Sequence, residues 1–123
     1  MIVHTILYVK DQVQSTHFYK LVLDQEPTLN EPGMTEFKLS EAHVLGLMPE
    51  SGIKKLLGKI PNPSQASGIP RAELYFRVDD PESMFMRAKE AGAVELSPIL
   101  GRDWGGRAGY VMDKDGHVLA LAT

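Results

Sequence analysis

The chain has 123 residues, 43% of them hydrophobic and 24% charged, which is the length and composition of one globular domain. It has no cysteine, so disulfides, thiolate metal sites and cysteine nucleophiles are excluded, and its net charge of −3 with scattered Lys and Arg residues offers no basic face for nucleic acid. The N-terminus lacks the features of a signal peptide and no apolar run approaches the ~20 residues that span a bilayer, so we expect a cytoplasmic protein without a membrane partner.

The first half of the chain predicts a strand, a helix and three further strands. Residues 2–9 alternate between two mostly apolar faces, which predicts a strand buried on both sides. Asp11 followed by Gln14 forms a capping-box pattern, which marks the start of an amphipathic helix over 12–23. The apolar stripe of this helix consists of Val13, Phe18, Leu21 and Val22. Short strand candidates follow at 27–30, 34–40 and 43–49.

The same order of elements returns in the second half. Residues 72–78 predict a strand, and Asp80 is a suitable N-cap for a helix that begins at Pro81. Gly92 suits the left-handed residue after that helix. The predicted buried stripe of the helix consists of Met84, Phe85, Ala88 and Ala91. Strand candidates then fall at 93–99, 107–112 and 117–122.

The two halves also match residue by residue, which indicates an internal repeat. HTILYVKD (4–11) aligns with ELYFRVDD (73–80), and HVLGL (43–47) aligns with HVLAL (117–121). A segment rich in Gly, Pro and Ser separates them and predicts a linker, with one helical turn around Lys54 to Leu57. We therefore expect a single domain over 1–123, with unit one at 1–50, the linker at 51–70 and unit two at 71–123.

A twice-repeated βαβββ unit with these openings, together with S-T-H-F-Y-K-L-V-L and the closing W-G-G-R-A-G-Y-V-M-D-K-D-G-H-V-L-A-L-A, resembles the vicinal-oxygen-chelate superfamily. This superfamily includes glyoxalase I, bleomycin-resistance proteins and extradiol dioxygenases. The resemblance covers the whole chain, although Lys114 and Asp24 stand where a proline and a glycine are usual. It implies an α+β fold in which tandem βαβββ units form curved mixed sheets with helices on their convex faces. It also implies a homodimer and a small-molecule cup, formed within one chain or across the dimer.

The resemblance also raises the question of a metal. In glyoxalase-like and dioxygenase-like members a divalent ion is held by side chains from equivalent strands of both units. The matching places here are His4, Glu73, Gly46 and Ala120, and the last two residues have no side-chain ligand. Because catalytic metal sites usually keep three protein ligands, we expect at most an incomplete site for Ni, Zn, Mn or Fe.

We do not expect His43 and His117 to replace the missing ligands at Gly46 and Ala120. Each lies an odd number of residues from the vacant place in its strand and should face away from the cup. His4 and Glu73 are instead expected to converge as a pair. Such a pair is either a structural ion pair or a catalytic one, in which the carboxylate fixes the imidazole tautomer and raises its basicity.

The remaining candidate site residues are aromatic, cationic or small. Tyr8 holds the place where glutathione-using members have an arginine, and Arg77 holds the equivalent place in unit two. The loop 101–107 contains the one tryptophan of the chain between glycines and arginines, which suits a planar or anionic ligand or else closes the end of the sheet. Its glycines would let it move over the cup. The predicted ligand-binding residues are Tyr8, Gly46, Tyr75, Arg77, Trp104, Arg107 and Ala120.

Three functional hypotheses follow. The first is a metal-independent binding protein of the bleomycin-resistance type, favoured by Gly46 and Ala120 because small residues would leave room for a ligand. The second is a divalent-metal-dependent lyase, isomerase or dioxygenase that uses His4 and Glu73. The third is a metal-free enzyme with His4 as base and Glu73 as its orienter. An enzymatic function would therefore be that of a glyoxalase-like lyase or a dioxygenase, and the sequence does not specify the substrate.

Overall fold

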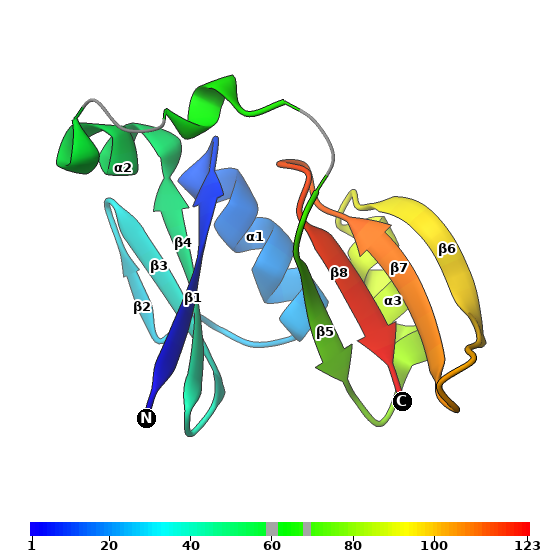
Figure 1. The fold of residues 1–123 in the computed structure, drawn as a ribbon. Helices are drawn as coiled ribbons and strands as arrows, with labels where there is room; N and C mark the ends of the chain where they lie inside the picture. Colours follow the sequence, from blue (N-terminus) through cyan, green and yellow to red (C-terminus); the bar gives the residue numbers. More distant parts are fainter. Residues whose placement is uncertain (59–61, 68–69) are drawn as a thin grey trace. The chain divides into compact units, whose positions relative to one another are not determined.

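A computed structural model describes residues 1–58, 62–67 and 70–123 of the chain (Figure 1). The chain divides into two units, one with Met1–Lys20 and Asp24–Gly68, the other with Leu21–Leu23 and Ile69–Thr123. Each unit contains one four-stranded mixed sheet, and helices accompany both sheets, which confirms the α+β fold class. Among the described residues, no helix has the length and apolar character needed to cross a membrane.

The sheet of the first unit has the strand order β1-β4-β3-β2, with β1 parallel to β4 and antiparallel pairing elsewhere. Its elements are β1 (Val3–Val9), α1 (Gln12–Leu23), β2 (Leu29–Glu31), β3 (Met34–Ser40) and β4 (His43–Pro49). The helix α2 (Glu50–Leu57) and the 3-10 helix η1 (Pro63–Gln65) follow, so the helical part of the predicted linker is longer than the single turn expected. Residues 59–61 and 68–69 of that linker lie outside the described residues.

The second unit repeats this connectivity. Its elements are β5 (Glu73–Arg77), α3 (Pro81–Glu90), β6 (Val94–Gly101), β7 (Arg107–Met112) and β8 (Val118–Ala122). The strand order is β5-β8-β7-β6, and β5 is again parallel to β8. The first strand of each unit therefore pairs with its last, as a repeated βαβββ unit requires.

Both helix N-caps read from the sequence are present. The Asp11 carboxylate accepts a hydrogen bond from the Gln14 N–H at 2.9 Å, and the Asp80 carboxylate accepts one from the Ser83 N–H at 3.0 Å. These side chains satisfy N–H groups that have no partner within the helix. At the other end of α1, Asp24 adopts φ +52°, the left-handed conformation that the superfamily's usual glycine would adopt more easily.

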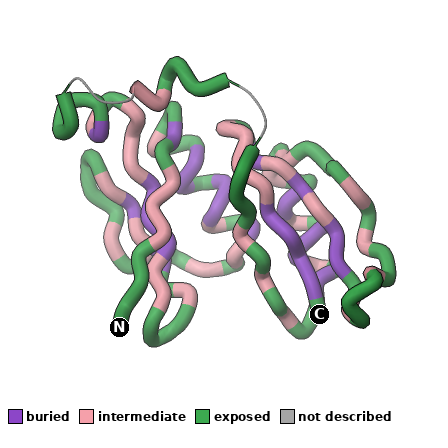
Figure 2. Tube along the Cα trace, viewed as in Figure 1, coloured by how far each residue is buried: buried purple, intermediate pink, exposed green. Residues whose placement is uncertain are grey.

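The core of the first unit lies on the sheet face that α1 covers. The hydroxyl groups of Thr16 on α1 and Thr35 on β3 are hydrogen-bonded at 2.8 Å, and both residues are buried. The fully buried apolar residues here are Val9, Tyr19, Phe37, Leu45 and Leu47. Figure 2 shows this burial along α1 and the central strands, while much of β1 is exposed.

Three burial predictions for β1 and α1 were wrong, one of them for Leu21 of the predicted apolar stripe, which is 43% exposed. The strand β1 is not buried on both faces, because it is an edge strand and α1 covers one face; of its residues only Val9 is buried. Val13 is 82% exposed instead of belonging to the apolar stripe of α1. It precedes Val22 by nine residues, and at about 100° per residue this places the two on opposite sides of the helix.

In the second unit α3 packs closely against the sheet. A β-carbon at Gly109 would lie 2.7 Å from Ile99 Cγ1 and 2.9 Å from the ring of Phe85 on α3. Met84, Phe85 and Ala88 are buried as predicted, whereas Ala91 is half-buried. Glycine at position 109 therefore lets the helix approach the sheet.

Candidate functional site

The two faces of the second sheet differ in burial. Along β5, Glu73, Tyr75 and Arg77 alternate with half-buried Leu74 and Phe76, as the sequence predicted. Cross-strand partners share a face of the sheet, so the register extends the face of Tyr75 over the neighbouring strands. The residues paired across from Tyr75 on this face are Ala120 on β8 and Tyr110 on β7.

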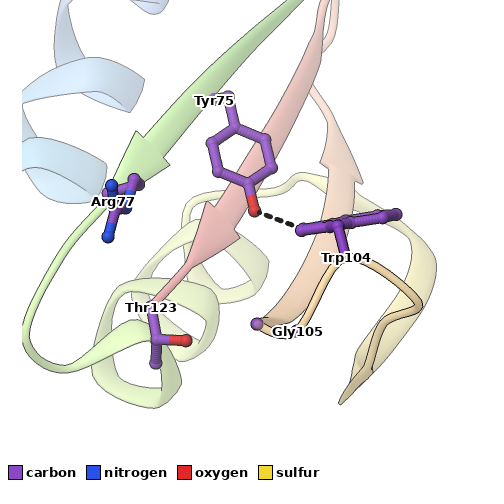
Figure 3. Close-up of a pocket in the computed structure, with 6 residues that line it drawn as sticks. Tyr75, Arg77, Trp104, Gly105 and Thr123 are labelled. Carbon is purple, nitrogen blue, oxygen red and sulfur yellow. Dashed lines mark hydrogen bonds between the residues drawn. The ribbon is translucent and has the colours of Figure 1, made fainter.

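A pocket of about 540 Å³ opens on the second unit (Figure 3). It is lined by Tyr75, Arg77, Trp104, Gly105, Gly106 and Thr123. Small-molecule sites typically have volumes of roughly 300–1,000 Å³, so the pocket has room for a drug-sized ligand. Three residues predicted from sequence as ligand contacts, Tyr75, Arg77 and Trp104, thus surround one cavity.

The aromatic side chains of the pocket are joined to each other. The indole N–H of Trp104 donates a hydrogen bond to the hydroxyl oxygen of Tyr75 at 3.2 Å. Arg77 has no hydrogen-bond or ion-pair partner among the described residues. The pocket therefore combines an exposed aromatic pair with the guanidinium group of Arg77.

The loop that carries Trp104 is anchored by Arg102. The Arg102 guanidinium donates to the Ala108 carbonyl at 2.7 Å and to the Ser97 hydroxyl at 2.6 Å, and it stacks 5.2 Å from the ring centre of Tyr110. The backbone N–H of Arg102 also donates to the Gly106 carbonyl at 2.8 Å. These bonds hold both ends of the loop at the sheet, and the expected movement of the loop over a ligand stays a prediction.

Arg107 does not line the pocket. It alternates with Ala108 and shares the face of Gly109, and its guanidinium forms an ion pair with Glu82 in the first turn of α3. The hydrogen bond between these groups lowers the pKa of Glu82 and raises the pKa of Arg107. The predicted role of Arg107 as a ligand contact stays a prediction without support from this arrangement.

In the first unit, His4 has a carboxylate partner that sequence reasoning missed. His4 Nδ1 lies 3.0 Å from Glu36 Oε2, and these side chains are 44% and 23% exposed. Glu36 on β3 pairs in register with Gly46, which in turn pairs with Ile6 on the His4 face of β1. The alternation of β3 could have placed Glu36 on one face, but the register that brings it to His4 could not be read from the sequence.

The partner predicted for His4 was Glu73, which belongs to β5 of the other unit. Glu73 has no hydrogen-bond or ion-pair partner among the described residues, and the His4–Glu73 pair stays a prediction. His43 faces away from His4, as predicted. Its Nε2 lies 2.7 Å from the hydroxyl of Thr5, on the opposite face of β1 from His4.

The two small residues at the vacant ligand places do not leave open room in their own units. A β-carbon at Gly46 would lie 2.5 Å from Ile6 Cδ1 and 3.3 Å from Met34 Sδ, so these side chains occupy the space beside it. Ala120 is fully buried. This corrects the argument that small residues vacate the ligand places, although neither residue supplies a metal ligand.

The first sheet offers two possible donors for a metal centre of the superfamily's kind. On the face of the first sheet that carries His4, the imidazole of His4 and the carboxylate of Glu36 are adjacent, and Gly46 offers no side-chain donor. Two protein ligands fall short of the usual three of a catalytic centre. The first sheet therefore supplies two donors, which do not make a complete metal site by themselves.

A second group of potential ligands lies in the turn between β7 and β8. Single ligand atoms of Asp113, Asp115 and His117 lie within 4.8 Å of one another. However, the Asp113 carboxylate accepts hydrogen bonds from the N–H groups of Asp115 and His117 at 2.9 and 2.8 Å and lies 2.8 Å from His117 Nδ1. These bonds fix the turn, so the group is explained by its local structure.

Comparison with known proteins gives the same fold. The chain is similar to a glyoxalase-related enzyme from Fulvimarina pelagi (22% identity, 99% of this chain and 86% of the other, TM-score 0.84). It is also similar to a glyoxalase/bleomycin resistance protein/dioxygenase family enzyme from Burkholderia phytofirmans PsJN. The identity is 18%, the match covers 97% of this chain and 94% of the other, and the TM-score is 0.82. The protein ATC0852 from Agrobacterium tumefaciens is 28% identical over 98% of this chain and 93% of the other, with a TM-score of 0.73. No curated protein matches the chain as a relative.

The family of the chain follows from its match to a known domain family. The Glyoxalase-like domain matches residues 2–123, which is nearly the whole chain and includes both βαβββ units. The structural neighbours named glyoxalase and bleomycin resistance protein agree with this match. The chain belongs to the glyoxalase-like domain family of the vicinal-oxygen-chelate superfamily.

Proposed function

We propose that this protein binds a small organic molecule without a resident metal ion, in the manner of bleomycin-resistance-type members of its family. The observation that carries the proposal is the pocket of the second unit, where Tyr75, Arg77 and Trp104 surround one cavity. Pockets with aromatic walls and a few placed polar groups are the usual form of small-molecule sites. The predicted contacts Tyr8, Gly46 and Ala120 lie outside the residues that line this pocket.

The absence of donors at two ligand places favours binding over metal chemistry. Gly46 and Ala120 have no side-chain atom that can coordinate an ion. A first-row ion held by one imidazole and one carboxylate would be bound weakly. Sequestration of a ligand needs no such ion.

A second candidate function is catalysis, either as a metal-dependent lyase, isomerase or dioxygenase using His4 and Glu73 or as a metal-free enzyme. The contact between His4 and Glu36 favours it. A carboxylate at Nδ1 fixes the tautomer of the imidazole and leaves Nε2 to accept a proton. This arrangement would give Glu36 the orienting role that the sequence suggested for Glu73.

Element analysis separates metal-independent binding from metal-dependent catalysis. Protein purified without chelators or nickel resin should contain well under one equivalent of Ni, Zn, Mn or Fe per chain. The His4→Ala variant should then have the same metal content, as should the control His17→Ala, which changes an exposed histidine of α1. One tightly held ion per chain that is lost in His4→Ala but retained in His17→Ala would contradict the proposal.

We also propose that the protein is a homodimer. Tyr8 and Tyr75 are each 39% exposed, and the edge strand β6 exposes Val94, Leu96 and Leu100. Exposed apolar surface of this kind usually marks an interface, and two-fold dimers are the commonest closed assemblies. Light scattering at micromolar concentration should give twice the chain mass of 13.6 kDa. A mass equal to one chain would contradict the proposal.

A further inference from the structure

We infer that the pocket of the second unit selects a planar aromatic ligand that carries one carboxylate, with the carboxylate on Arg77 and the ring against Trp104. The inference rests on the proposed function, because it specifies the ligand class of the same pocket. Three features support it: the polarity of the pocket's side chains, its charge and the fixed position of the indole.

The polar side chains of the pocket present hydrogen-bond donors. Arg77 is a donor with no partner among the described residues. The Tyr75 oxygen accepts from the indole of Trp104, and the Thr123 hydroxyl oxygen accepts from the Arg107 N–H at 3.2 Å, so both hydroxyl hydrogens are left to donate. A ligand group that satisfies these donors must be an acceptor, and a carboxylate offers the most acceptor sites on one small group.

The charge of the pocket suits a ligand with one negative charge. Arg77 is the one cation among the lining residues. The neighbouring Arg102 is bonded to carbonyl and hydroxyl oxygens, and Arg107 is paired with Glu82. Glu73 lies two residues from Tyr75 on the same face of β5, so a ligand with two or more negative charges would meet one cation and a nearby carboxylate. A monoanion is therefore favoured over a phosphate monoester.

The planar part of the ligand is inferred from Trp104. Trp104 is 61% exposed, which is unusual for a large aromatic residue whose side-chain N–H is already bonded. The bond to Tyr75 and the Arg102 anchor fix the indole before any ligand arrives. A flat ring can stack on such a surface without the entropic penalty of ordering the loop.

Titration calorimetry with 1-naphthoate and 1-naphthamide tests the inference, because the two compounds share one ring system and differ in charge. Naphthoate should bind about 10-fold more tightly, since only the carboxylate gains a charge-assisted bond to Arg77. Arg77→Gln should weaken naphthoate binding about 10-fold and naphthamide binding less than about 2-fold. Lys89→Gln, which removes the same charge from α3 outside the pocket, should change neither affinity.

The outcomes distinguish this inference from the proposed function. Equal affinities for the two compounds, unaffected by Arg77→Gln but lost in Trp104→Ala, would overturn the carboxylate assignment and support the pocket as a small-molecule site. Binding of neither compound would overturn the inference. If Trp104 emission also stayed unchanged with a panel of neutral and cationic aromatic compounds, the proposed function would fail at this pocket as well.

Discussion

The indole N–H of Trp104 donates to the hydroxyl of Tyr75 across 3.2 Å and so connects the β6–β7 loop to β5, the strand at the far edge of the same sheet. These residues are 29 positions apart in the sequence. The bond determines which way the indole faces and which polar hydrogens of the pocket remain for a ligand. It is therefore the contact on which the binding proposal depends most.

Tyr75→Phe should free the indole while keeping an aromatic ring in the pocket. Without the acceptor oxygen, the Trp104 N–H turns to water, and the emission of this single tryptophan should shift to longer wavelength. Affinity for 1-naphthoate should fall by roughly 3- to 10-fold, as expected for one lost hydrogen bond and a less ordered indole. Fluorescence emission and titration of the two proteins check this; an unchanged spectrum would show that the bond does not form in solution.

Arg102→Met should release the loop from the sheet. The substitution leaves the carbonyl of Ala108 and the hydroxyl of Ser97 without their charged donor, which should lower the free energy of unfolding by about 2 kcal/mol. Trp104 should become more accessible to acrylamide quenching. Arg107→Met is the matched control in the same hairpin, and because its ion pair with Glu82 is exposed it should change quenching little. Equal quenching in both variants would mean that Arg102 does not position the loop.

The fold could be predicted from the sequence because its signals are local or repeated. Asp11 and Asp80 mark helix starts that depend on the next three residues alone, and the matched HVLGL and HVLAL segments reveal the repeat. Burial was predicted less well. Val13 is apolar and near the helix start, but the side of the helix that is buried is the one that carries Phe18, Tyr19 and Val22.

Gly109→Ala should destabilise the second unit. The new methyl group would lie within 3 Å of both Ile99 and the Phe85 ring, and overpacking of this kind costs about 1–3 kcal/mol. Gly101→Ala is the matched control, since no atom lies within 4 Å of a β-carbon there. Urea unfolding of both variants should show a lower free energy of unfolding for Gly109→Ala alone. Equal stability of the two would contradict the packing of α3 against β7.

Asp80 should contribute an acid-sensitive part of the stability. Hydrogen bonds from Ser83, its side chain first and then its backbone N–H, together with the charge of Arg87, lower the pKa of Asp80 below its ordinary value of 3.8. A carboxyl group with a lowered pKa stabilises the fold above its unfolded-state pKa, and this contribution is lost as the pH falls through its folded-state pKa. The stability difference between the wild type and Asp80→Asn should therefore shrink below about pH 4. A difference that stays constant from pH 7 to pH 3, measured by urea unfolding, would contradict this.

The candidate site was predicted in part. Tyr75, Arg77 and Trp104 could be selected because a strand alternation and a lone tryptophan in a glycine-rich loop are visible in the sequence. Glu36 and Arg102 could not, because their roles depend on register and on carbonyl groups that the sequence does not locate. Arg107 lies in the same loop region as Trp104, yet the alternation of β7 turns it toward Glu82.

The most direct test of the central claim is a titration of 1-naphthoate followed by Trp104 emission, with one sample dialysed against EDTA and one untreated. Metal-independent binding in the Tyr75, Arg77 and Trp104 pocket predicts the same affinity in both samples and its loss in Trp104→Ala, measured there by calorimetry. The claim is contradicted if EDTA abolishes binding and added Ni, Zn, Mn or Fe restores it.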